Sequence, residues 1–236
     1  MNIACVTAHP DDVEILCAGT MIKYIQKGHK VTYIIATNGE VGSPTLSNEE
    51  IAKVRYGEAQ EAARIVGADL IWLGYPDEFL FENRETRLAF LNALRKAKAD
   101  VVFTHYEDYY NCDHNAVSNI TNNVGIHLTI KNIPTEYPPL EHNPYLYFMD
   151  TITGLGFDPD EYVDITDVID IKKEALMAHK SQYTWLKDQN DIDYVDMMLA
   201  QAHLRGYQCG VQYAEAFIGV KAYPRGITKS LLPQYV

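Results

Sequence analysis

Hydrophobic positions in the first half of the chain alternate between two spacings. Four runs rich in β-branched and aromatic residues predict strands, at residues 2–8, 30–37, 69–74 and 100–105. Apolar residues at helical spacing predict helices between these strands, over residues 15–28, 47–66 and 84–98. Ser47 and Glu50 suit a capping box that opens the second helix. Gly28 and Gly67 suit the ends of the first two helices. This alternation is typical of βαβ units.

The second half of the chain is less regular. Further strands are expected at residues 145–150, 162–166 and 213–222. A helical pattern spans residues 167–204, with a break near Tyr183 to Asp191. The Pro-rich stretch at residues 133–144 reads as a connection and not as a domain boundary. We therefore expect a single domain over residues 1–236.

The near-continuous apolar character of the predicted strands favours a sheet that is buried on both faces. We therefore predict an α/β fold, a Rossmann-like doubly wound and mostly parallel sheet with helices on both faces. In the Rossmann order 3-2-1-4, the first and fourth strands are neighbours. Ligands of such sheets bind beyond the carboxyl ends of the strands, where the strand order reverses.

The two most polar loops of the chain follow these two neighbouring strands. His9, Asp11 and Asp12 come directly after the first strand, and the segment HYEDYYNCDH at residues 105–114 follows the fourth. Both loops should therefore meet at the same crevice. A dinucleotide site at this place would need a glycine-rich turn, but two aspartates stand there and would repel a pyrophosphate.

A metal site suits these residues better. Imidazole and carboxylate groups together suit Zn²⁺ or another divalent transition ion. His9, one of the two aspartates and His114 would supply three ligands and leave one position for water. The other aspartate could take a proton from that water, and the spacing leaves open which aspartate does which. As an alternative, Asp11 and Asp12 would only cap a helix, but the convergence of the two loops favours a metal.

Composition narrows the range of partners. The formal net charge of −12 and the lack of a Lys/Arg cluster argue against a nucleic-acid partner. No apolar run approaches the roughly 20 residues that span a bilayer. The chain opens directly on a strand and its four cysteines show no CxxC spacing, so we expect a cytoplasmic protein without disulfides. We expect a small-molecule partner and no membrane partner, and the sequence leaves open whether the chain forms a homo-oligomer.

Several motifs resemble the LmbE/PIG-L family of zinc-dependent N-deacetylases. They run over nearly the whole chain, as AHPDDVE (8–14), NGE (38–40), RYGEA (55–59), DH (113–114), HKSQ (179–182) and YAEAF (213–217). Members of this family hydrolyse the amide of N-acyl amino sugars, chiefly N-acetylglucosamine conjugates. The resemblance therefore implies a zinc-dependent hydrolase with a small amino-sugar substrate.

The resemblance also assigns roles to residues. It implies that His9, Asp12 and His114 bind the metal and that Asp11 is the general base. Arg55 matches an arginine that binds the sugar, with a helix-surface pair to Glu58 as the alternative.

Three further residues are candidates for roles near the expected site. By the family resemblance, His179 matches a histidine near the site and is expected to be catalytic, with a buried structural histidine as the alternative. Tyr109 lies where it could contact the substrate or assist the reaction. Asp113 is expected to orient a metal ligand or the base.

One position departs from the family pattern. The family usually has HPDH where this chain has Asn111-Cys112-Asp113-His114. The missing histidine stabilises the oxyanion and protonates the leaving amine, so Asn111 is the residue expected to take over part of this catalytic work. The alternative function is a non-catalytic or weakly active protein of the same fold that binds metal or sugar.

Overall fold

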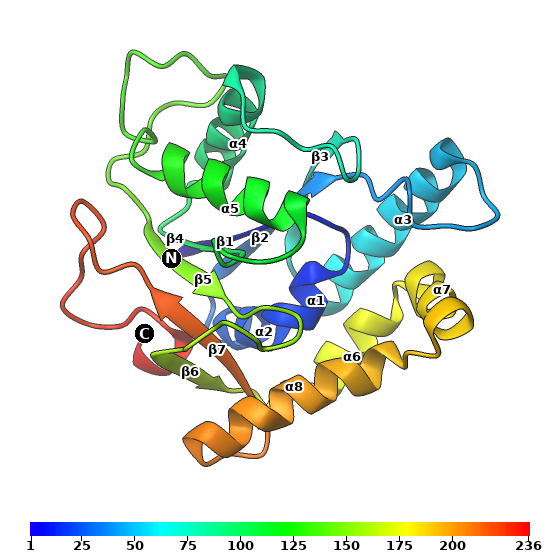
Figure 1. Cartoon of the computed structure of the whole chain (residues 1–236). Helices are drawn as coiled ribbons and strands as arrows, with labels where there is room; N and C mark the ends of the chain where they lie inside the picture. The colour runs from blue at the N-terminus through cyan, green and yellow to red at the C-terminus, as the bar shows by residue number, and fades with distance from the viewer.

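A seven-stranded sheet runs through the middle of the protein in a computed structural model that describes residues 1–236 (Figure 1). The strands are β1 (Asn2–Thr7), β2 (Lys30–Thr37), β3 (Asp69–Tyr75), β4 (Val101–Thr104), β5 (Tyr145–Met149), β6 (Glu161–Asp164) and β7 (Ala214–Gly219). They lie in the order β3-β2-β1-β4-β5-β7-β6, and the first five are mutually parallel. β7 is antiparallel to β5 and β6. The predicted order 3-2-1-4 and the mostly parallel sheet are confirmed.

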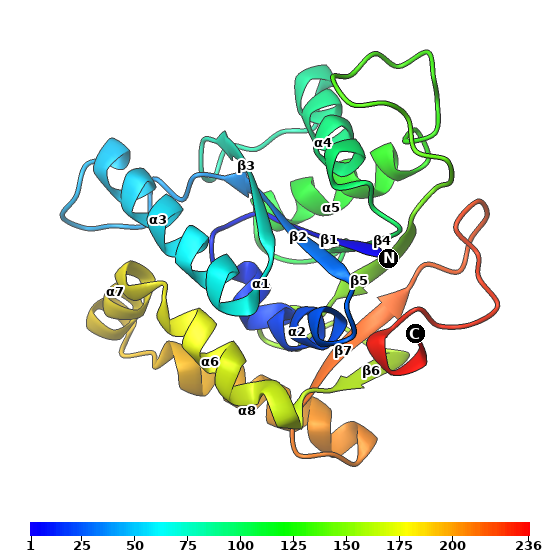
Figure 2. The same cartoon turned by 180° about the vertical axis from the view of Figure 1, so that it is seen from behind.

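Helices cover both faces of the sheet, as predicted. They are α1 (Asp12–Leu16), α2 (Ala18–Gln26), α3 (Asn48–Val66), α4 (Arg84–Ala97), α5 (Cys112–Gly125), α6 (Ile169–Met177), α7 (Lys180–Asn190) and α8 (Tyr194–Cys209), with 3-10 turns at Thr166–Val168 and Pro233–Tyr235. α4 and α5 lie on one face, whereas α1, α2, α6 and α8 lie on the other (Figures 1 and 2). None of these helices combines the length and apolar character needed to cross a bilayer.

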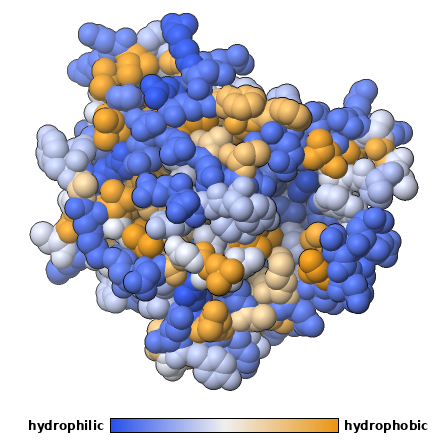
Figure 3. All heavy atoms as spheres, viewed as in Figure 1, coloured by the Kyte–Doolittle hydropathy of each residue, from blue (hydrophilic) through white to orange (hydrophobic).

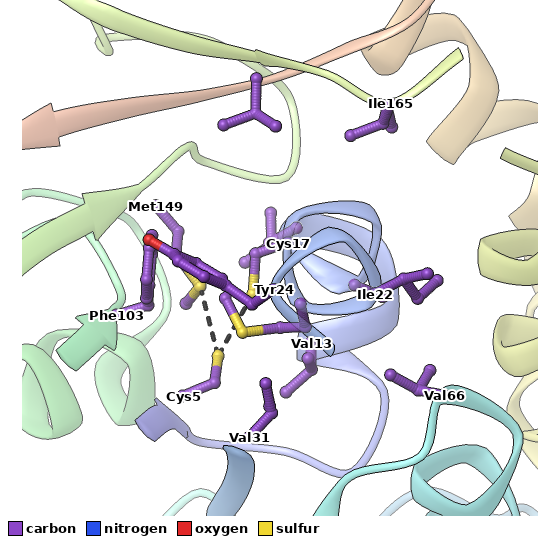
Figure 4. Close-up of a cluster of buried hydrophobic side chains, with 14 of the residues drawn as sticks. Cys5, Val13, Cys17, Ile22, Tyr24, Val31, Val66, Phe103, Met149 and Ile165 are labelled. Atoms are coloured by element: carbon purple, nitrogen blue, oxygen red, sulfur yellow. Dashed lines mark hydrogen bonds between the residues drawn. The ribbon is translucent and has the colours of Figure 1, made fainter. Parts of the chain in front are cut away.

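Two hydrophobic clusters flank the sheet because alternate residues of a strand point to opposite faces. Ile3 and Cys5 of β1 belong to the cluster with α1, α2 and α6, and Ala4 and Val6 belong to the cluster with α4 and α5. Figure 4 shows the first cluster, in which the Cys5 thiol lies 3.2 Å from the Cys17 sulfur. Both cysteines are free and buried. β1 is thus held from both sides up to its carboxyl end.

Local signals place the start and end of α3 where the sequence predicts them. The Ser47 hydroxyl accepts a hydrogen bond from the Glu50 amide, and the Glu50 carboxylate accepts one from the Ser47 amide. The helix ends at Gly67, whose φ of 90° lies in the left-handed region that favours glycine. α3 is therefore fixed at both ends, and its side chains face the site at defined positions.

The helix expected over residues 15–28 is in fact two helices, α1 and α2, separated at Cys17. The prediction of one helix was wrong because a distant carboxylate caps the second one. Glu215 of β7 accepts hydrogen bonds from the backbone amides of Gly19 and Thr20 at 2.9 and 2.7 Å. A Cβ atom at Gly19 would lie only 2.7 Å from Ile165, so glycine allows this close approach.

The break expected near Tyr183 to Asp191 was also wrong, because α7 covers most of these residues. The chain instead leaves helical geometry around His179, before α7, and at Asp191, where φ is 53°. α7 is a largely exposed helix, and Gln182 is its one fully buried residue. A helix with so little buried surface carries a weak apolar periodicity, which explains why the sequence pattern did not reveal it.

Candidate active site

A tight turn after β1 presents the first residues of the site. Both the amide and the hydroxyl of Thr37 donate to the Ala8 carbonyl, at 2.8 and 2.9 Å, and so fix the end of the strand. Asp11 follows with a φ of 139°, which is rare for a residue other than glycine. The Asp12 carboxylate accepts the His9 amide at 2.7 Å. The turn therefore sends Asp11 and Asp12 in different directions.

The structure brings His9, Asp12 and His114 together, as the convergence of the two loops predicts. His114 Nε2 lies 3.1 Å from His9 Nδ1 and 3.2 Å from Asp12 Oδ1. One potential ligand atom from each residue lies within 4.8 Å of the others, so the three residues could hold one metal ion. Two imidazole nitrogens and one carboxylate oxygen form a donor set that suits zinc.

Two further carboxylates lie on the far side of His9. Its Nε2 atom is 3.2 Å from Asp77 Oδ1 and 3.6 Å from Asp113 Oδ2. A carboxylate on the remote nitrogen fixes the ring orientation of a metal-binding histidine and leaves Nδ1 for the metal. The second group that could hold a metal, His9 with Asp77 and Glu78, uses this remote side and includes the exposed Glu78. We therefore favour the His9–Asp12–His114 side.

The electrostatics of this cluster favour positive charge. Burial opposes protonation of His9, but the carboxylates of Asp113 and Asp12 raise its pKa well above the usual value. Burial also opposes ionisation of Asp12, but His114 and His105 lower its pKa well below the usual value. Such a carboxylate-rich pocket can be satisfied by protons or by a bound cation. The surroundings thus fit a divalent ion.

His105 directly follows β4 and is part of the site, although it was not among the residues predicted to act there. Its Nε2 atom lies 3.2 Å from Asp12 Oδ2 and accepts the Ala8 amide at 3.0 Å. Its ring stacks on that of His114, with centroids 3.8 Å apart. Burial lowers the pKa of His105 to about 4, so the ring is neutral near pH 7 and packs as a support for His114 and Asp12.

Asp11 faces Arg55 and not the imidazoles. The Arg55 guanidinium donates to Asp11 Oδ2 at 3.2 Å and to the carbonyl oxygens of Pro10 and Gly39. Arg55 is only 4% exposed, so the alternative of a helix-surface pair with Glu58 was wrong. Tyr194 of α8 also borders Asp11; burial, and then this carboxylate, raise the pKa of its hydroxyl.

Tyr109 and Asn111 lie beside His114 in the loop before α5. The Tyr109 ring stacks on His114 with centroids 5.5 Å apart, and its buried hydroxyl has no hydrogen-bond partner. The Asn111 side-chain oxygen accepts the backbone amides of Asp113 and His114 at 2.9 and 3.0 Å. Asn111 therefore caps α5, which leaves its amide NH₂ as the group that could reach a substrate.

His179 lies farther back. It is fully buried, and its Nε2 atom lies 3.1 Å from the Glu14 carboxylate on α1. Burial opposes its protonation, but Glu14 raises the pKa of His179 above the usual value. The ring thus contacts the helix that begins with Asp12 and not the cluster of possible metal ligands.

Sequence reasoning missed Asp77, His105, Glu14 and Tyr194. Asp77 and His105 each follow a strand at its carboxyl end, which is the signal that identified His9 and His114. A stricter use of that signal would have found both residues. Glu14 lies within the AHPDDVE motif, but its partner His179 is far away in the chain. Tyr194 lies in a helical stretch and carried no signal.

Comparisons with known proteins show which proteins this chain resembles. A family profile described as GlcNAc-PI de-N-acetylase (PIG-L) matches residues 4–124. The solved structure of N,N'-diacetylchitobiose deacetylase from Pyrococcus horikoshii is similar, with a TM-score of 0.81, 28% identity, and coverage of 92% of this chain and 83% of that one. A probable N-acetyl-alpha-D-glucosaminyl L-malate deacetylase 2 of Bacillus anthracis is 27% identical over 83% of this chain and 87% of its own length.

The fold also occurs with another chemistry. The 4-carboxy-2-hydroxymuconate hydratase of Pseudomonas putida KT2440 has a TM-score of 0.82 with 21% identity, over 98% of this chain and 100% of that one. At this identity the likeness concerns the fold alone. The reaction must therefore be argued from the residues of the site.

Proposed function

Because the chain belongs to the PIG-L family of GlcNAc-PI de-N-acetylases, a family with deacetylases of GlcNAc-type substrates, we propose that it is a metal-dependent N-deacetylase. The proposed reaction is hydrolysis of the N-acyl amide of an N-acetylglucosamine-type conjugate, or of a similar small polar amide. One observation carries this proposal: Asp11, held by Arg55, adjoins the cluster of His9, Asp12 and His114.

We assign the metal to His9 Nδ1, a carboxylate oxygen of Asp12 and His114 Nε2, and expect Zn²⁺ or another divalent transition ion. When bound, such an ion supplies Lewis acidity toward the amide carbonyl and the attacking water. Asp77 and Asp113 keep His9 in the orientation that binding needs. The His105 ring packs against His114 and holds that ring in the orientation that metal binding needs.

Asp11 is the proposed general base. Arg55 donates to one of its oxygens and leaves the other to accept a proton from the attacking water. The protonated Asp11 can then deliver that proton to the leaving amine. Positioning Asp11 is the role that the geometry supports for Arg55, and the contact with the sugar that the family resemblance implies stays a prediction.

Two donors could stabilise the oxyanion that forms during amide hydrolysis. The Asn111 NH₂ group is free because the cap of α5 uses only its oxygen. The Tyr109 hydroxyl has no other partner and its ring lies against His114. We propose that Asn111 and Tyr109 donate to the oxyanion or to the sugar, in place of the histidine that the family usually has.

The experiment that tests the proposal measures metal content and activity on the same protein. Protein purified without chelator should carry about one divalent ion per chain and release acetate from N-acetylglucosamine conjugates. His114→Ala should lose both properties. His142→Ala is the matched control, because His142 is exposed and bonds only Asp100. If neither endogenous nor added zinc binds, the metal assignment is wrong.

The second candidate function is a metal- or sugar-binding protein with little activity. The neutral Asn111 at the usual histidine position favours it, because an asparagine cannot carry a proton near pH 7. A protein that binds zinc and N-acetylglucosamine but releases no acetate from a panel of N-acyl amino sugars would favour this candidate over the hydrolase.

A further inference from the structure

The segments that surround the candidate active site contain no lysine or arginine. Five parallel strands end at this edge of the sheet, and the segments that follow them contain ten aspartates and glutamates. These segments are residues 8–11, 38–47, 76–83, 105–111 and 150–160. We call residues 38–47, 76–83, 105–111 and 150–160 the mouth loops. They lie around the first turns of α1 and α5 (Figure 1).

Most cations that reach these segments from other elements are bound to acidic groups. Arg87 pairs with Glu82, Arg205 with Asp150 and Lys221 with Asp160. Arg55, on the buried side of the site, pairs with Asp11. Lys180 faces a separate cavity of about 420 Å³ between α3, α7 and the first mouth loop.

Acidic groups without such a partner remain at the entrance. Glu78, Glu107, Asp108 and Asp158 are exposed, and Glu40 is half-buried. None of these five carboxylates forms an ion pair with a basic side chain. An anionic group that approaches these five carboxylates would therefore be repelled.

Exposed aromatic rings stand among these carboxylates. Phe79 is 65% and Tyr110 is 80% exposed, although both segments are well anchored. The amides on either side of Phe79, those of Glu78 and Leu80, donate to the Asp113 carboxylate at 2.8 and 3.1 Å. The Tyr110 ring lies 4.5 Å from the ring of Tyr109. Figure 3 shows one face of the molecule, on which hydrophobic residues lie among hydrophilic ones.

We propose that the mouth loops select neutral glycosides of an N-acyl amino sugar and reject anionic conjugates. This inference rests on the proposed function and narrows its substrate class. A second, uncharged sugar ring presents C–H groups on one face, which suit the rings of Phe79 and Tyr110. A carboxylate or phosphate at the same place would face Glu78, Glu107 and Asp108. The selection thus combines an attractive element with a repulsive one.

The test compares two substrates that share the reacting group. N,N'-diacetylchitobiose is neutral, and N-acetylglucosaminyl malate carries two carboxylates. With the zinc-loaded protein at low salt, kcat/KM should be at least about tenfold higher for the neutral substrate. The ratio should shrink as sodium chloride is raised to about 0.5 M, because salt screens exposed charges.

Charge reversal in the mouth loops should change kcat/KM for the anionic substrate only. The double variant Glu107→Lys with Asp108→Lys should raise kcat/KM for the malate conjugate severalfold. Glu136→Lys with Glu141→Lys is the matched control, since it changes the net charge equally but lies before β5, at the opposite edge of the sheet. Phe79→Ala should raise KM more for the disaccharide than for methyl N-acetylglucosaminide.

Binding measured by calorimetry separates this inference from the proposed function. If the protein binds chitobiose more tightly than the malate conjugate but hydrolyses neither, the proposed function fails and the selection stands. If the malate conjugate is hydrolysed as fast as chitobiose or faster at low salt, the selection is wrong and the hydrolase stands. If neither compound binds or reacts, both proposals fail.

Discussion

Asp11 and Asp12 are neighbours in the chain but have opposite surroundings. The Asp12 carboxylate lies between His105 and His114, within 3.2 Å of each ring. The Asp11 carboxylate lies against Arg55 on the other side of the turn. The unusual φ of Asp11 produces this divergence. Two adjacent carboxylates can therefore divide the work, one for the metal and one for the proton.

Asp11→Asn tests this division. The substitution keeps the shape and the hydrogen bond to Arg55 but removes the ability to accept a proton. We expect kcat to fall by roughly 10²–10⁴, the usual contribution of a general base, while zinc content and melting temperature stay close to those of the wild type. Steady-state kinetics with elemental analysis measure both. Loss of zinc would instead identify Asp11 as a ligand, and an unchanged kcat would move the base elsewhere.

Asn111 has two functional ends that substitutions can separate. Asn111→Asp keeps an acceptor for the two amides that begin α5 but removes the NH₂ donor. If that donor stabilises the oxyanion, kcat should fall by about 10²–10³ with little change in stability.

Asn111→Ala, in contrast, should also lose about 1 kcal/mol of stability with the helix cap. Thermal melts beside the kinetics distinguish the two variants. A fully active Asn111→Asp enzyme would exclude Asn111 as a donor and leave Tyr109 as the remaining candidate.

At the scale of elements, α7 is a polar helix that is joined to several parts of the site. Its HKSQ motif contacts three separate segments: His179 contacts Glu14 of α1, Ser181 donates to Glu58 of α3, and Gln182 donates to the Gly42 carbonyl. Arg55 on α3 lies one turn from Glu58. The motifs AHPDDVE, RYGEA and HKSQ thus form one connected group behind Asp11.

The contact between His179 and Glu14 predicts a pH-dependent part of the stability. Because the folded-state pKa of His179 is raised, its stabilising effect is fully present below the unfolded value of about 6.5 and is lost as pH rises through the folded value. The difference in unfolding free energy between wild type and His179→Gln should therefore shrink above pH 6.5, by at most about 1.4 kcal/mol per pH unit.

Urea unfolding of both proteins from pH 6 to 9 measures this difference. Glu14→Gln should abolish the same pH dependence, since it removes the charge that favours the protonated ring. A difference that stays constant over this range would mean that His179 does not titrate there, and that its contact with Glu14 has only a packing role.

The strengths and gaps of the sequence analysis have physical causes. The strands and α3 carry strong local signals, and the convergence of His9 and His114 follows from strand order alone. The division at Cys17 could not be predicted, because Glu215, nearly 200 residues away, caps α2. The partners of Arg55 and His179 could not be predicted either, because Asp11 and Glu14 are also distant in the sequence. These contacts depend on tertiary packing that no local pattern records.

At the scale of the whole molecule, the candidate metal site lies between the end of β1 and the starts of α1 and α5. Its ligands come from segments about a hundred residues apart, so an ion bound there would add a further connection between distant parts of the chain. Without an ion, several carboxylates would lie close together in a buried place. The stability of the folded protein should therefore depend on metal.

Removal of the metal should lower the melting temperature. For zinc present at a hundred times its dissociation constant, the loss amounts to about 2.7 kcal/mol. In a chain of this size that corresponds to roughly 5–11 °C. Calorimetry before and after treatment with a chelator measures the shift, and His114→Ala should melt at the same temperature in both conditions. A wild-type melting temperature that does not change on treatment with the chelator would contradict a metal at this site.

The two hydrogen bonds that Asp113 accepts from Glu78 and Leu80 have a consequence for exchange with solvent. Both amides lie in an irregular loop, where exchange with deuterium is normally fast. Because their acceptor also faces His9, loss of an ion beside His9 would loosen Asp113 as well. The Glu78 and Leu80 amide protons should therefore exchange slowly in the zinc-loaded protein and faster after chelation. These two protons would act as spectroscopic reporters of the occupancy of the site, readable without any substrate.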